Sequence, residues 1–138
     1  MARAAQLREG EYARKQLFGG VGLLRWSHGS RFRVARDLVA PHAGGRLLDY
    51  GCGDGTFLAT VRDLFPHAVG AEVDAALVDE TARRFADEPG LSFVHTGRLQ
   101  GEADGSFALA ACMEVLEHCT AQAADHVIAD LRRLVAPG

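Results

Sequence analysis

The 138-residue sequence predicts an α/β protein with a doubly wound, mostly parallel sheet. Short apolar runs alternate with amphipathic stretches, in the order strand, helix, strand, helix, strand, strand, helix. This alternation is typical of parallel strands joined by helices that cover the sheet. The length is close to the commonest domain size, which favours one core. We expect residues 45–138 to form this domain and residues 1–44 to form a helical lead-in.

The lead-in is expected to contain two helices separated by a loop. Residues 1–16 are polar with few large apolar side chains, which predicts a fraying helix. The glycine-rich stretch 18–30 predicts a mobile loop. A second helix is expected over residues 31–40, with Ser30 as its N-cap and Pro41 as its stop.

The remaining elements follow from apolar patterning and from capping residues. Four strands are expected, over residues 46–50, 68–73, 91–96 and from 106 to near Cys112. Four helices are expected, over residues 56–65, 74–88, from near 112 to 118, and 122–135. Asp74 is the expected N-cap of the second of these helices. The chain ends before a further strand would be expected. We therefore expect a fold truncated after its fourth strand and the following helix, with an open sheet edge.

Charge and cysteine usage argue against several classes of protein. The net charge of −3 predicts no general attraction to nucleic acid or to anionic membranes. Three cysteines without a C-x-x-C pair argue against a disulfide framework or a zinc knuckle, and favour the reducing cytoplasm. No apolar run is long enough to span a bilayer, and the first residues do not form a signal peptide. A soluble, cytoplasmic protein without a membrane partner is expected.

A glycine-rich loop lies between the first expected strand and helix, in the stretch LLDYGCGDGTFLATV from Leu47 to Val61. Such loops bind nucleotide-like ligands at the carboxyl ends of strands. The dinucleotide pattern G-x-G-x-x-G fails because position 56 is a threonine, and no G-K-[ST] of a P-loop follows. Asp49 ends the strand, where its charge would repel a phosphate. The loop therefore suits a ligand that carries an ammonium group.

The pattern D-x-G-x-G-x-G, formed by Asp49, Gly51, Gly53 and Gly55, resembles motif I of the class I S-adenosylmethionine-dependent methyltransferases. In that family the glycine loop packs under the methionine portion of the cofactor, and the acidic residue binds its amino group, often through water. The resemblance implies a Rossmann-like domain that binds S-adenosylmethionine (SAM), with the lead-in as a lid over the cofactor.

The second expected strand ends with a further acidic residue, Glu72, 23 residues after Asp49. At this position the family has a carboxylate that hydrogen-bonds both ribose hydroxyls. Where the family commonly has G-D-A after the third strand, this sequence has Gly97-Arg98-Leu99, so adenine recognition is expected to depend on backbone groups. The cofactor-binding residues that the resemblance implies are Asp49, Gly51, Cys52, Gly53, Gly55, Glu72, Val73, Gly97, Arg98 and Met113.

An acidic cluster follows the fourth expected strand in the sequence MEVLEH. Glu114, Glu117 and His118 stand at i, i+3 and i+4, so a helix that begins by Glu114 would direct all three into the cleft. They are solvated acids beside a structural histidine, or catalytic residues with His118 as general base, or ligands of Mg²⁺ or Mn²⁺. Small-RNA 3′-terminal 2′-O-methyltransferases and ubiquinone-pathway O-methyltransferases carry a similar E-x-x-E-H and use it for metal.

These features predict a SAM-dependent methyltransferase that acts on a small-molecule acceptor, with O-methylation as the expected reaction. One alternative is a truncated fold that binds SAM or a partner without turnover, for example as a dimer through the open sheet edge. Another is a metal-assisted RNA 3′-end 2′-O-methyltransferase, although RNA is the less favoured partner. An NAD-linked oxidoreductase is disfavoured by Thr56.

Overall fold

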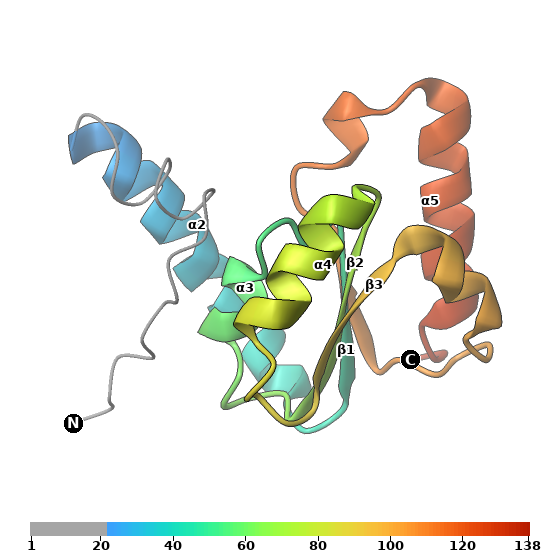
Figure 1. Ribbon diagram of the computed structural model, residues 1–138, viewed down its shortest axis with the longest axis horizontal. Coiled ribbons are helices and arrows are strands. Elements are labelled where there is room, and N and C mark those ends of the chain that lie inside the picture. The colour runs from blue at the N-terminus through green and yellow to red at the C-terminus, as the bar shows by residue number, and fades with distance from the viewer. Residues whose placement is uncertain (1–21) are drawn as a thin grey trace.

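A computed structural model describes the backbone of residues 22–138 and the side chains of residues 30–138. Four strands form a single parallel sheet in the order β3-β2-β1-β4 (Figure 1). They are β1 (Arg46–Tyr50), β2 (His67–Glu72), β3 (Leu91–His95) and β4 (Leu109–Ala111). The sheet confirms the predicted doubly wound α/β class.

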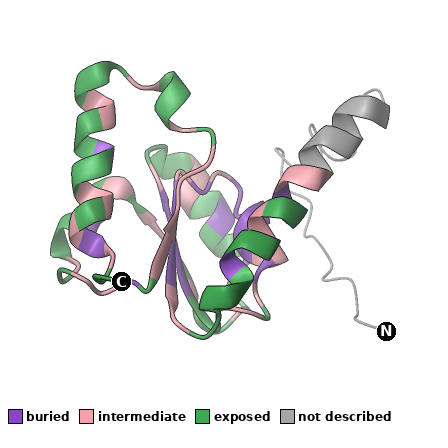
Figure 2. Cartoon of the chain, turned by 180° about the vertical axis from the view of Figure 1, so that it is seen from behind, coloured by how far each residue is buried: buried purple, intermediate pink, exposed green. Residues whose placement is uncertain are grey.

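Helices cover both faces of this sheet. They are α2 (Gly22–Val39), α3 (Thr56–Thr60), α4 (Ala75–Arg84) and α5 (Ala121–Leu134), with the 3-10 turns η2 (Ala40–His42), η3 (Thr96–Gly101) and η4 (Leu116–His118). Leu47 packs with α2 and α3 on one face, whereas Leu48 packs with α5 on the other, because successive strand residues point to opposite faces. Buried positions therefore line both sides of the central strands (Figure 2).

The strand order reverses between β1 and β4. The chain runs outward from β1 through β2 to β3, and then returns to the other side of β1 to form β4. In this arrangement Asp49 of β1 lies level with Ala111 of β4. Loops that leave the two strands diverge at such a reversal and leave a crevice at the carboxyl ends. The two segments that border this crevice are residues 51–55 and 112–118.

The lead-in differs from its prediction. Helix α2 begins at Gly22, so the part of the glycine-rich stretch that the structure describes is helical, and Ser30 lies inside the helix instead of capping it. Phe32 and Val39, both within the predicted range 31–40, are buried against the sheet. The helix expected over residues 1–16 lies outside the described residues.

Two further helices are shorter than expected. Helix α3 ends at Thr60, and turns carry the chain to Phe65, which is fully buried. Helix α4 begins where predicted, since the Asp74 carboxylate accepts hydrogen bonds from the backbone N–H groups of Ala76 and Leu77 at 2.9 and 3.3 Å. It ends at Arg84, four residues before the predicted end.

One edge of the sheet is formed by β4 and the other by β3. Within residues 22–138, the hydrogen-bonded neighbour of β4 among the strands is β1. Just before β4, Phe107 forms an isolated parallel bridge with Val135, and the N–H of Ala136 donates to the Phe107 carbonyl at 2.8 Å. Within the described part of the chain, no further strand pairs with Leu109–Ala111 on the side away from β1. None of the helices described is long and apolar enough to cross a membrane.

Candidate active site

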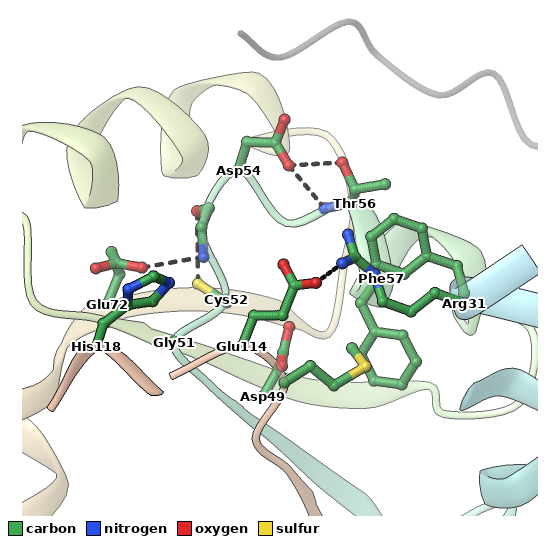
Figure 3. A pocket seen from close by; sticks show the side chains of 13 residues that line it. Arg31, Asp49, Gly51, Cys52, Asp54, Thr56, Phe57, Glu72, Glu114 and His118 are labelled. Carbon is green, nitrogen blue, oxygen red and sulfur yellow. Dashed lines mark hydrogen bonds and ion pairs between the residues drawn. The ribbon is translucent and has the colours of Figure 1, made fainter. Parts of the chain in front are cut away.

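A cavity of about 300 Å³ lies at the carboxyl ends of β1 and β4 (Figure 3). Its volume falls at the lower end of the range for small-molecule sites. Its wall is formed by helix α2, the end of β1, the glycine loop with the start of α3, the end of β2, and the segment after β4. The lining residues are Arg31, Phe32, Asp49, Gly51, Cys52, Gly53, Asp54, Thr56, Phe57, Glu72, Met113, Glu114 and His118.

The glycine loop turns sharply away from the sheet at Gly51. The backbone N–H groups of Gly51 and Cys52 both donate to the Ala71 carbonyl, at 2.7 and 3.0 Å. Gly51 has φ 78°, and a Cβ at this position would overlap a methyl group of Val115. Gly53 has φ 53°, and a Cβ built on it meets no atom within 4 Å. Glycine therefore permits both the turn and close approach of a ligand to the loop backbone.

The loop is held from behind by Asp54, which is buried. Its Oδ1 accepts hydrogen bonds from the N–H and hydroxyl of Thr56, at 3.2 and 2.5 Å. The Arg84 guanidinium donates to the Asp54 carbonyl at 2.6 Å. Asp54 and Thr56 were not among the predicted site residues, although aspartate two residues before threonine is a known signal for this local turn.

Asp49 contributes a buried carboxylate to the cavity wall, with only 2% of the residue exposed. Among residues 30–138, no group donates a hydrogen bond to this carboxylate. Burial, and secondarily the nearby charge of Glu72, raises the pKa of Asp49 to about 7. A charge in this position is costly unless a cation lies beside it. The site is therefore complementary to a positively charged ligand group.

Glu72 is fixed at the end of β2 by three backbone donors. Its Oε2 accepts from Gly53 N–H at 3.1 Å, and its Oε1 accepts from the N–H groups of Val73 and Asp74 at 2.7 and 3.3 Å. Each carboxylate oxygen retains acceptor capacity beyond these bonds. The carboxylate also lines the cavity and can accept from ligand hydroxyls there.

Cys52 also lines the cavity, as predicted, but it is not a candidate nucleophile. Burial, together with the charge of Asp49, raises the pKa of the Cys52 thiol far above its usual range. The thiol therefore stays protonated at neutral pH and acts as a small apolar part of the wall.

The opposite wall is formed by the segment after β4. Met113, Glu114 and His118 line the cavity there, and Glu114 has a left-handed backbone with φ 54°. The Glu114 carboxylate forms an ion pair with the Arg31 guanidinium, which also lies 5.1 Å from the centre of the Phe32 ring. Arg31 and Phe32 line the cavity because α2 packs beside it, an arrangement that no local sequence pattern predicts.

The predicted helical face of Glu114, Glu117 and His118 is wrong. No helix begins by Glu114: its left-handed backbone precedes the short turn η4, so the i, i+3, i+4 geometry of an α-helix is absent. Glu117 is exposed and does not line the cavity. Across residues 30–138, whose side chains the structure describes, no three His, Cys, Asp or Glu side chains are grouped so as to hold a metal ion. The expected Mg²⁺ or Mn²⁺ site is therefore not supported.

Four predicted cofactor residues lie outside the cavity wall. Gly55 packs behind the loop, where a Cβ would lie 3.0 Å from both Phe85 and Phe93. Val73 is 71% exposed. Gly97 and Arg98 are exposed within η3, and the Gly97 N–H donates to His95 Nδ1 at 3.1 Å.

Residues 47–138 match the family described as Methyltransferase domain. The match covers most of the chain, which therefore belongs to this family, as its resemblance to class I SAM-dependent methyltransferases implied. Among curated proteins, the chain is 36% identical over 108 residues to the ubiquinone biosynthesis O-methyltransferase of Roseobacter denitrificans. That alignment covers 75% of this chain and 42% of the relative, so the chain spans less than half of the relative's length.

Solved structures share the fold. The PH0226 protein from Pyrococcus horikoshii OT3 superimposes with a TM-score of 0.70 at 20% identity, over 94% of this chain and 62% of that one. SAM-bound CalS10, an amino pentose methyltransferase from Micromonospora echinaspora, has a TM-score of 0.61 at 25% identity, with 82% and 52% covered. The [4+2]-cyclase SpnF has a TM-score of 0.64 at 28% identity, with 80% and 43% covered. The fold thus also occurs in a protein described as a cyclase, and the reaction must be argued from the site.

Proposed function

We propose that this chain binds SAM and forms the cofactor-binding part of an enzyme that methylates an oxygen of a small molecule. The observation that carries the proposal is the buried Asp49 carboxylate, which lines the cavity without a hydrogen-bond donor from the described residues. An ammonium group beside it would offset the cost of its burial. The amino-acid end of SAM carries such a group.

The other residues of the cavity fit the rest of the cofactor. The Arg31 guanidinium is suited to the ligand carboxylate, because it offers several donors in one plane. Glu72, fixed by its three backbone donors, is suited to the two ribose hydroxyls. Gly53 leaves the loop backbone open to close approach. When bound, the cofactor supplies an already activated methyl group, so the protein's contribution is alignment and exclusion of water.

His118 is the candidate general base for the acceptor. It lines the same cavity from the segment after β4, across from the glycine loop. A neutral imidazole can accept the proton of an acceptor hydroxyl as the oxygen attacks the methyl group. Transfer to oxygen also agrees with the name of the curated relative, an O-methyltransferase.

The charge of the cavity favours a small acceptor over RNA. Four carboxylates line the cavity, from Asp49, Asp54, Glu72 and Glu114, against the single guanidinium of Arg31 among the described residues. A wall with this balance repels the phosphates on which RNA affinity depends. A small neutral or cationic hydroxyl compound fits it better.

Calorimetric titration with S-adenosylhomocysteine tests the cofactor proposal. The wild-type protein should bind, and Asp49→Asn should weaken binding at least about tenfold because a buried charge-assisted contact is lost. Asp79→Asn removes one exposed carboxylate of α4 away from the cavity and should bind like the wild type. Absence of binding by the wild type, or equal binding by Asp49→Asn, would contradict the proposal. Transfer of labelled methyl from SAM to a panel of small hydroxyl compounds then distinguishes an enzyme from a module that only binds.

A further inference from the structure

Arg31 is the one arginine or lysine among the described residues that line the cavity, and it is already paired. Its Nη1 contacts Glu114 Oε1, and the side chains of the two residues are 22% and 43% exposed. Figure 3 shows them pointing toward one another beside Asp49. A ligand carboxylate that enters the cavity therefore meets a guanidinium whose charge is partly neutralised.

The Arg31–Glu114 pair also joins two separate parts of the fold. Arg31 belongs to α2, whereas Glu114 follows β4 on the other side of the cavity. Glu114 is the one residue other than glycine with positive φ among residues 22–138. A glutamate pays a conformational cost in this region, and such outliers concentrate at ligand sites and switches. Its carboxylate is thus held where it contacts Arg31, in a conformation that an unconstrained glutamate avoids.

We propose that Glu114 is an internal competitor for Arg31, which the carboxylate of the bound cofactor must displace. This inference rests on the function proposed above. In the free protein Glu114 pairs with Arg31 and links α2 to the segment after β4. In the bound protein the ligand carboxylate takes this guanidinium, and the link between the two segments is released. Re-formation of the pair then favours departure of the demethylated product.

The expected size of the effect follows from the exposure of the pair. A partly exposed ion pair contributes only a modest free energy, so its loss should tighten ligand binding about two- to fivefold. Glu114→Gln should therefore bind S-adenosylhomocysteine more tightly than the wild type. Arg31→Gln should bind it more weakly, because the ligand carboxylate loses its partner. In a protein that already carries Arg31→Gln, adding Glu114→Gln should not tighten ligand binding, because no guanidinium is left for the two carboxylates to compete for.

Calorimetric titration of these four proteins with S-adenosylhomocysteine gives a direct test. Asp37→Asn is the matched control, since it removes one exposed carboxylate of α2 away from the cavity and should leave the affinity unchanged. Glu114→Asn is the second variant, because asparagine tolerates positive φ and also lacks the charge. 5′-Methylthioadenosine, which has no carboxylate, should show no gain with either Glu114 variant.

Unchanged or weaker binding of S-adenosylhomocysteine by both Glu114 variants would overturn the inference and leave the proposed function standing. So would a gain that persists in the Arg31→Gln background, or an equal gain for 5′-methylthioadenosine. Failure of the wild-type protein to bind S-adenosylhomocysteine would overturn the proposed function and this inference with it.

Discussion

Replacing Asp49 by asparagine should stabilise the ligand-free protein, by an amount that grows with pH. Burial raises the pKa of Asp49 from 3.8 to about 7 in the folded state. Between pH 3.8 and pH 7, Asp49 therefore keeps a proton in the folded protein that it has lost in the unfolded chain. The stability contributed by this protonated carboxyl is complete below pH 4 and is lost as the pH rises through 7. Wild-type Asp49 thus costs about 4 kcal/mol above pH 8, and more than half of this cost develops between pH 5 and pH 8.

Urea unfolding of the wild type and of Asp49→Asn at several pH values between 5 and 8 measures this difference. The difference in unfolding free energy at any one pH also includes the packing of the new amide, which does not titrate. The informative quantity is therefore how this difference changes with pH. Asp63→Asn is a matched control, because the hydrogen bond from Arg36 lowers the pKa of Asp63 and so keeps this carboxyl ionised in both the folded and the unfolded protein between pH 5 and 8. Its deficit relative to the wild type should therefore stay constant over this range. A stability difference for Asp49→Asn that stays constant from pH 5 to 8 would refute the reasoning.

Two further predictions concern the same loop. S-adenosylhomocysteine should bind the wild type about tenfold more weakly at pH 6 than at pH 8, because protonated Asp49 must lose its proton to pair with an ammonium group. Calorimetry in buffers of different ionisation enthalpy would detect the released proton. An affinity that does not change between pH 6 and pH 8 would contradict this prediction. Gly51→Ala should cost about 2–4 kcal/mol in thermal unfolding, because φ 78° strains alanine and its Cβ would overlap Val115. Gly101→Ala, where a Cβ meets no atom within 4 Å, is the matched control.

Much of the fold and the glycine loop could be predicted from local sequence. Apolar runs and capping residues identified all four strands and the start of α4, because these signals act within a few residues. The spacing of Asp49, Gly51 and Gly53 located one wall of the cavity, because the end of β1 and the loop that follows it carry all three. The start of α2 and the ends of α3 and α4 were wrong, because helix boundaries are only weakly encoded in local sequence.

The opposite wall could not be predicted in the same way. The predicted helix at Glu114 assumed continuous α-helical periodicity, whereas the chain takes one left-handed step before η4. That step separates Glu117 from the cavity while Glu114 and His118 still line it. No local sequence pattern predicts this left-handed conformation, because glutamate rarely adopts positive φ. It does so here in contact with Arg31, a residue far away in the sequence.

By itself the sequence determined the class of fold, the family and the acidic, glycine-rich loop that is complementary to an ammonium group. Each of these depends on which residue types stand a few positions apart, and such patterns can be recognised without knowing the fold. Only the tertiary structure decided that Asp49 is buried enough to raise its pKa, and that Arg31 and Glu114 meet across the cavity. Burial and long-range ion pairs depend on how α2 and the segment after β4 pack around the end of β1, and packing between distant segments is not encoded in any single stretch.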